Sequence, residues 1–247
     1  MAATSRFEGF RFKQFAIEHK NCAMKVGTDG ILLGSWIPTG DYSSILDIGT
    51  GSGLIAIMLA QRSVAQCDIL GIDIDQSAIL QAQKNALNCP WSSQLTFVHR
   101  ALQQLPQIQR YDLIVSNPPY FEGKSGELLS SDANFISDSR RKARHNNTLN
   151  FSELFQHVSI LLNKDAYFYC ILPAETIALE ALAQEHGLYC DRRTWVKSSP
   201  FKPPKRQLLR FGFEPAQPQV TDLCIHDCEG AYSADYIELC RDYYLNF

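Results

Sequence analysis

The chain has 247 residues, of which 45% are hydrophobic, and its formal net charge at pH 7 is −3. A chain of this size can bury one good core but is short for two, and its negative charge argues against a non-specific nucleic-acid binder. The sequence has no run of 18 apolar residues and no basic, apolar leader, so we expect a soluble protein that is not exported.

The eight cysteines are scattered and form no Cys-x-x-Cys pair. This distribution is typical of reduced, mostly buried thiols in a cytoplasmic protein. Cys224, His226 and Cys228 lie close enough in sequence to suggest a metal site. Alternation along a strand is the simpler interpretation, and we expect no metal.

The first 43 residues predict a hairpin followed by a helix. Residues 6–20 alternate aromatic and polar side chains, which favours paired strands. Residues 25–36 predict a helix that Thr28 or Asp29 could cap, with Leu32, Leu33 and Trp36 on its apolar face.

Residues 45–60 predict a strand, a glycine turn and a helix. Gly49, Gly51 and Gly53 allow a tight turn that brings the backbone close to a ligand. A dinucleotide site would have the spacing Gly-x-Gly-x-x-Gly and hold a pyrophosphate, which Asp47 would repel. The spacing here is Gly-x-Gly-x-Gly, and it resembles the S-adenosylmethionine loop, where a carboxylate beside a sulfonium amino acid is favourable.

Two further strands follow at residues 68–73 and 95–101, separated by a helix from about 75 to 88. Asp73 ends the first of these strands, where a carboxylate can accept hydrogen bonds from both hydroxyls of a ribose. We expect Ile74 to lie against the adenine of the same ligand.

The segment from Tyr111 to Tyr120 predicts a buried strand that stops at a stiff turn. Leu113, Ile114 and Val115 are apolar, and the two prolines after Asn117 cannot continue a ladder. The Asn117 amide oxygen and a backbone carbonyl are both acceptors, and together they suit a planar NH2 group. A plain Pro-Pro loop is the alternative interpretation.

The tetrapeptide Asn117-Pro118-Pro119-Tyr120 resembles the Asn/Asp-Pro-Pro-Tyr/Phe signature of S-adenosylmethionine-dependent amino-methyltransferases. The resemblance implies that these four residues form the catalytic turn, with Tyr120 stacking on the ring that carries the amine. Many members carry Asp where this chain has Arg100, so we expect backbone groups of Arg100 and Ala101 to meet the cofactor adenine. The cofactor-binding residues that the resemblance implies are Lys25, Thr28, Asp29, Asp47, Gly49, Thr50, Gly51, Gly53, Asp73, Ile74, Arg100, Ala101 and Asn117.

The second half begins with a long polar loop, residues 122–147, which ends in a basic cluster. Helices are predicted at 149–162, 174–186 and 233–247, and strands at 166–172, 188–196 and 207–213. The last two strands should form an antiparallel hairpin, because the proline-rich loop between them leaves no room for a crossover helix. We therefore predict one α/β domain over 1–247: an extension (1–43), a Rossmann-like core (44–214) with a seven-stranded, mostly parallel sheet and helices on both faces, and a C-terminal extension (215–247).

Over its full length the chain resembles the bacterial tRNA(Val) adenine-N6-methyltransferase family, which modifies the adenosine just after the anticodon. That resemblance implies S-adenosylmethionine as cofactor and tRNA as substrate. We expect a monomer, and from the two basic stretches of the sequence we expect RNA phosphates to be held by Arg140, Arg141, Lys142, Arg144, Lys202, Lys205 and Arg206. Alternatives are a protein glutamine methyltransferase of the release-factor type, another RNA adenine N6-methyltransferase, or a non-catalytic cofactor-binding subunit. Only 46 residues precede Asp47, which leaves no room for the helical substrate domain of the release-factor enzymes.

Overall fold

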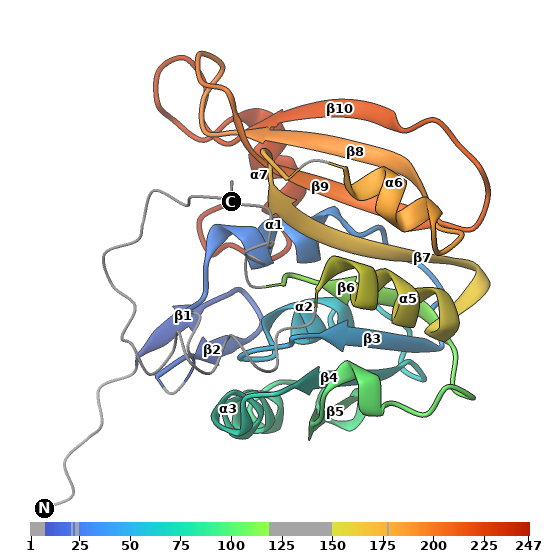
Figure 1. The fold of residues 1–247 in the computed structure, drawn as a ribbon. Helices are drawn as coiled ribbons and strands as arrows, with labels where there is room; N and C mark the ends of the chain where they lie inside the picture. The colour runs from blue at the N-terminus through green and yellow to red at the C-terminus, as the bar shows by residue number, and fades with distance from the viewer. Residues whose placement is uncertain (1–7, 21, 23–24, 119–149, 177) are drawn as a thin grey trace, which may run out of the picture.

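The computed structural model describes residues 8–20, 22, 25–118, 150–176 and 178–247. Its centre is an eight-stranded sheet with the order β10-β8-β9-β7-β6-β3-β4-β5, which Figure 1 shows from the top of the view to the bottom. Neighbouring strands are parallel, except that β9 is antiparallel to both β7 and β8. The strands of this sheet are β3 (Ser44–Ile48), β4 (Asp68–Asp73), β5 (Leu95–His99), β6 (Tyr111–Ser116), β7 (Leu162–Pro173), β8 (Tyr189–Lys197), β9 (Pro204–Gly212) and β10 (Gln219–Cys224).

Helices cover both faces of the sheet. The buried side chains of α1, α2, α3 and α7 pack in one apolar cluster, and those of α5 and α6 pack in a second cluster on the opposite face. The helices are α1 (Thr28–Trp36), α2 (Leu54–Ala60), α3 (Gln76–Leu87), α5 (Phe151–Leu161), α6 (Leu179–Gln184) and α7 (Ala234–Cys240), with 3-10 turns η1 (Ser92–Gln94) and η2 (Leu102–Gln104).

Local sequence explains where several helices begin. Asp75 caps α3 by accepting a hydrogen bond from the Ser77 backbone N–H at 2.8 Å. Asn150 and Glu153 form a reciprocal capping box at the start of α5. Helix α1 differs from the expectation, because Gly27 occupies its cap position and no side chain caps it. Asp29 lies in the first turn, where its charge suits the positive end of the helix.

The structure confirms the α/β class, the seven predicted strands and the β8–β9 hairpin. It corrects the strand count: an eighth strand, β10, comes from the region predicted as a C-terminal extension, and it joins the sheet edge beside β8. The predicted helix at 174–186 is helical only as α6, and the predicted helix at 233–247 only as α7.

The predicted N-terminal hairpin is present as β1 (Gly9–Arg11) and β2 (Ala16–Glu18). It packs against the C-terminal segment: Phe15 meets Tyr243 edge-on and Phe10 meets Tyr244 edge-on, with ring centroids 6.5 and 5.7 Å apart. The Lys13 backbone N–H donates to the Tyr243 carbonyl at 2.8 Å. The two ends of the described chain are therefore held together on one side of the sheet.

Across the part of the chain that the structure describes, no helix is both long enough and apolar enough to span a bilayer.

Candidate functional site

Three neighbouring parallel strands bring the central candidates to one edge of the sheet. Ile48 of β3 pairs with Ile72 of β4 on one side and with Ser116 of β6 on the other. The residues that follow, Gly49, Asp73 and Asn117, therefore lie level with one another where these strands end. This is the edge at which open α/β sheets bind ligands.

The glycine turn between β3 and α2 adopts backbone conformations that favour glycine. Gly49, Gly51 and Gly53 have φ angles of 71°, 56° and 80°. A Cβ at Gly49 or Gly51 would meet no described atom within 4 Å, so these two backbones border open space. A Cβ at Gly53 would lie 2.9 Å from the Phe97 ring, so this glycine is needed for packing instead.

Asp47 lies beneath this turn and is only 1% exposed. Its Oδ2 accepts a hydrogen bond from the Thr50 hydroxyl at 2.7 Å, while its Oδ1 has no partner among the described residues. Burial raises the pKa of the Asp47 carboxyl to about 7, and the Thr50 hydrogen bond partly opposes that rise. The unpartnered oxygen can therefore accept a hydrogen bond from a ligand.

Asp73 connects the end of β4 to the glycine turn. Its Oδ2 accepts from the Gly51 N–H at 2.9 Å and its Oδ1 from the Asp75 N–H at 2.9 Å. Each carboxylate oxygen retains a second acceptor site, so the side chain can still receive two hydroxyls. Burial raises the pKa of Asp73, against the opposing effect of these hydrogen bonds.

The three residues expected to contact the cofactor adenine differ in their exposure and in the hydrogen bonds that they already make. The Ile74 side chain is 57% exposed beside Asp73 and is available for stacking. The Arg100 N–H already donates to the Asp73 carbonyl, and the Ala101 N–H to Gln104 Oε1 at 3.2 Å. The backbone N–H groups of Arg100 and Ala101 are thus occupied within the protein. The Ala101 carbonyl also accepts from the Gln104 N–H at 3.0 Å, so a ligand amine could reach only its second acceptor site or the Arg100 carbonyl.

Asn117 and Pro118 follow β6 directly; Asn117 is half-buried and Pro118 is buried. The Ser116 hydroxyl donates to the Ile48 carbonyl at 2.9 Å, which ties the end of β6 to the end of β3. Pro119 and Tyr120 lie outside the described residues, as does the basic cluster of Arg140, Arg141, Lys142 and Arg144.

The remaining candidates lie around α1 and the start of β9. Lys25 and Thr28 are exposed. Asp29 Oδ2 forms an ion pair with Arg206 Nε at 2.8 Å, so the structure joins two residues that we had assigned to different ligands. Lys202 and Lys205 are exposed, the first in the loop between β8 and β9 and the second at the start of β9.

Cys224, His226 and Cys228 do not form a metal-binding cluster in the part of the chain that the structure describes. No cluster of three or more His, Cys, Asp or Glu side chains suited to a metal occurs in the described ranges. His226 Nδ1 instead lies 3.0 Å from the Ser198 carbonyl, and its ring stacks on Tyr232.

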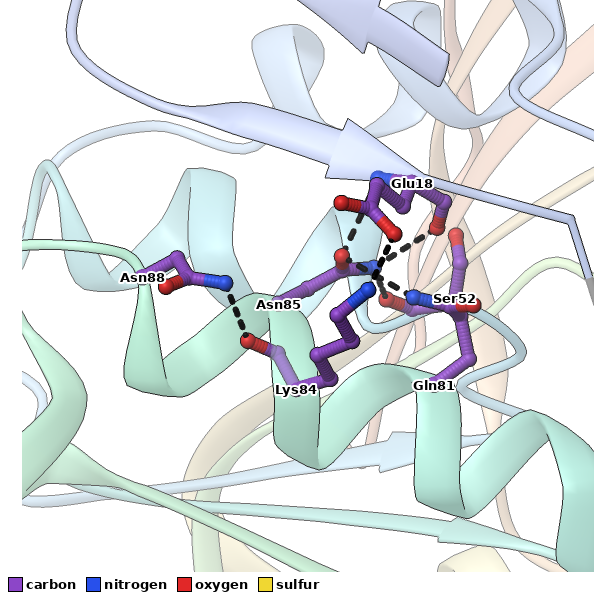
Figure 2. Close-up of polar contacts among 6 residues, drawn as sticks. All are labelled: Glu18, Ser52, Gln81, Lys84, Asn85 and Asn88. Carbon is purple, nitrogen blue, oxygen red and sulfur yellow. Dashed lines mark hydrogen bonds and ion pairs between the residues drawn. The ribbon is translucent and has the colours of Figure 1, made fainter. Parts of the chain in front are cut away.

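A residue that sequence reasoning missed, Asn85 of α3, supports the glycine turn from behind (Figure 2). Its Nδ2 donates to the carbonyls of Ser52 and Glu18, both at 2.9 Å. Its Oδ1 accepts from the Glu18 N–H at 3.0 Å and from Gln81 Nε2 at 3.3 Å. The only sequence signal was a pair of amides, Gln81 and Asn85, one turn apart on the face of α3 that also carries Ala78 and Ala82.

Comparison with known proteins agrees with this geometry. The family model described as the methyltransferase small domain matches residues 22–156. The chain is 41% identical to a tRNA1(Val) (adenine(37)-N6)-methyltransferase from Pseudoalteromonas atlantica, over 97% of this chain and 99% of the relative. It is 42% identical to the protein of that name from Photobacterium profundum, over 96% of this chain and 98% of the relative. A predicted O-methyltransferase from Agrobacterium tumefaciens has the same fold, with a TM-score of 0.63 and 16% identity over 87% of this chain and 96% of that one.

The fold and the strand-end site thus define a class I methyltransferase. Within that class, the chain belongs to the tRNA1(Val) (adenine(37)-N6)-methyltransferase family.

Proposed function

We propose that this protein transfers the methyl group of S-adenosylmethionine to N6 of adenosine 37 in tRNA1(Val). The observation that carries the proposal is the level placement of Gly49, Asp73 and Asn117 on three adjacent strands. Adjacent strands are about 4.8 Å apart, so the turn assigned to the cofactor and the turn assigned to the amine are immediate neighbours. The relatives named tRNA1(Val) (adenine(37)-N6)-methyltransferase match nearly the whole chain, which supports this choice of substrate.

The described residues fit the cofactor. Gly49 and Gly51 leave open space where any Cβ would intrude, and the buried Asp47 Oδ1 has no partner among the described residues. We assign the methionine end of S-adenosylmethionine to this turn and to Lys25, Thr28 and Asp29, the ribose to Asp73, and the adenine to Ile74 and the carbonyls of Arg100 and Ala101. The cofactor supplies an electrophilic methyl group.

Asn117 and Pro118 orient the amine. The Asn117 side-chain oxygen and the Pro118 carbonyl accept its two N–H groups, which turns the nitrogen lone pair toward the methyl group. S-adenosylmethionine bound at the neighbouring turn would supply the methyl group to this lone pair and leave as S-adenosylhomocysteine, and the methylated amine would release a proton to water. Pro118 and Pro119 keep the turn stiff, and Tyr120 stacks on the splayed-out adenine. Alignment and preorganised acceptors supply most of the acceleration.

We assign lysines near the start of β9 to the RNA backbone. Lys202 and Lys205 are exposed, and we assign them to tRNA phosphates together with Arg140, Arg141, Lys142 and Arg144. Arg206 is held by Asp29, so we expect it to position the loop more than to bind phosphate. We further propose that the chain acts as one domain and as a monomer in the cytoplasm.

The test is methyl transfer from radiolabelled S-adenosylmethionine into an extract of a strain that lacks this protein, divided and treated with ribonuclease or protease. We expect label in tRNA, as N6-methyladenosine, that ribonuclease removes and protease does not. Label that resists ribonuclease but not protease would instead indicate the glutamine methyltransferase.

The variant Asn117→Ala tests the site. Loss of one preorganised acceptor should lower the single-turnover rate at least about a hundredfold, with little effect on cofactor affinity. Asn117→Asp keeps acceptor oxygens and should retain more activity. Asn88→Ala, which removes an exposed amide bonded to the Lys84 carbonyl, is the matched control. Equal loss of rate and cofactor affinity in Asn117→Ala would contradict the assigned role.

A further inference from the structure

An aromatic ring projects from the loop that joins β8 to β9. Phe201 is 81% exposed, although it is a large apolar side chain. Pro200, Pro203 and Pro204 restrict the backbone around it, and the Lys202 N–H donates to the Ser199 carbonyl at 3.2 Å to close a turn. The ring therefore stands on a stiff loop and has little contact with the protein.

The sheet places this loop beyond the edge where Asn117 lies. Cys170 of β7 pairs with Ser116, and Pro173, three residues further along β7, pairs with Arg206 of β9. The loop leaves β9 in the same outward direction, and Figure 1 shows it beyond the end of β7, at the upper left. At the spacings of a sheet, Arg206 at the base of the loop is two strands, or about 10 Å, to the side of Asn117 and about 7 Å further out.

Both sides of the loop are fastened to the body of the protein. The Ile225 and His226 N–H groups donate to the carbonyls of Lys197 and Ser198 at 2.9 and 3.2 Å. On the other side, Arg206 is held by its ion pair with Asp29 of α1. A recognition group on such a base is already in position, so binding costs less conformational entropy.

We propose that Phe201 is a stacking platform for an unpaired base of the tRNA substrate, next to the adenosine held at Asn117. This inference rests on the proposed function and names how that site recognises its RNA. Proteins read single-stranded RNA by stacking its bases on aromatic side chains, flanked by cations that hold the phosphates. Phe201 has that setting, because the exposed Lys202 and Lys205 lie on the same loop and at its base.

The test is the affinity for tRNA of Phe201→Ala, measured with unmodified valine tRNA. Loss of one stacked base should weaken binding by roughly fivefold to a hundredfold. Phe201→Tyr should keep nearly all of the affinity, because it keeps the ring. Thermal stability and cofactor affinity should not change in either variant, since the ring is exposed and distant from the glycine turn.

Ile108→Ala is the matched control. Ile108 is 93% exposed and lies just before β6, at the opposite edge of the sheet, so its truncation should leave tRNA affinity unchanged. A salt series separates stacking from charge. Phe201→Ala should keep the wild-type slope of log Kd against log salt, whereas Lys202→Ala should reduce that slope by about one.

An anticodon stem-loop with 2-aminopurine in place of each loop base in turn gives a direct readout. One position should lose fluorescence on binding to wild type and regain it with Phe201→Ala. Wild-type tRNA affinity in Phe201→Ala would overturn the stacking proposal alone, while failure of the wild-type protein to methylate tRNA would overturn the proposed function.

Discussion

Truncation of Asn85 should loosen the glycine turn and reduce stability at the same time. Asn85 is 2% exposed and makes four hydrogen bonds, two as donor and two as acceptor. In Asn85→Ala the Ser52 carbonyl and the Gln81 amide lose a partner while they remain buried, at about 1–3 kcal/mol each. The backbone of Glu18 is half-buried, so its N–H and carbonyl can form hydrogen bonds with water instead, and their loss of Asn85 should cost less. We therefore expect the free energy of unfolding to fall by about 2–6 kcal/mol.

The affinity for the cofactor should show the effect of Asn85→Ala on the glycine turn separately from its effect on stability. The Ser52 carbonyl lies between Gly51 and Gly53, so its release frees the backbone that meets S-adenosylmethionine. Urea unfolding gives the stability, and calorimetric titration of S-adenosylmethionine into folded protein gives the affinity. We expect the affinity to fall at least about tenfold. Leu161→Ala, a buried truncation on the opposite face that costs about 2–5 kcal/mol, should leave it unchanged.

Asn85→Asp sharpens this test. Its carboxylate keeps the two acceptor bonds but would face the Ser52 and Glu18 carbonyls without a proton to donate. Burial and these carbonyls should raise its pKa, so the variant should be most stable at low pH and lose stability as the pH rises. Asn88→Ala on the same helix should have little effect in either assay, because that side chain is exposed. Wild-type stability and affinity in Asn85→Ala would refute this account of the turn.

Two other predictions concern the same turn. Gly49 and Gly187 have φ angles of 71° and 73°, and a Cβ at either would meet no described atom within 4 Å, so alanine at each should cost about 1–2 kcal/mol of left-handed strain. Only Gly49→Ala should also weaken binding of S-adenosylmethionine in calorimetry, and equal affinity in the two variants would show that the cofactor lies elsewhere. The pKa of Asp47 is raised to about 7 in the folded protein, from an ordinary value of 3.8, so the folded state binds the extra proton between these values. The contribution of Asp47 to the free energy of unfolding is therefore fully present below about pH 4 and is lost as the pH rises toward and through 7. Asp47→Asn should lose less stability than wild type between pH 5 and 8 in urea unfolding, and parallel profiles would contradict the assignment.

The sequence by itself determined the parts of the site that rest on local constraints. Glycines at 49, 51 and 53 permit positive φ angles, and two prolines after Asn117 end a strand, whatever the rest of the chain does. Because parallel strands end at a common edge, the order of these signals along the chain also predicted that Asp73 and Asn117 would lie near the glycine turn.

Only the tertiary structure decided which distant residues meet. Asp29 and Arg206 are 177 residues apart, and an ion pair over that separation leaves no local pattern. Asn85 lies on a helix face where an apolar residue is the usual choice, and its value comes from the Ser52 and Glu18 backbones that reach it. Strand β10 is mostly exposed at the sheet edge, so it lacks the alternation of buried and exposed residues that identifies a strand. Strand β7 begins at Leu162, directly after α5 and four residues before the predicted strand, because Leu162 pairs with Tyr111 of β6.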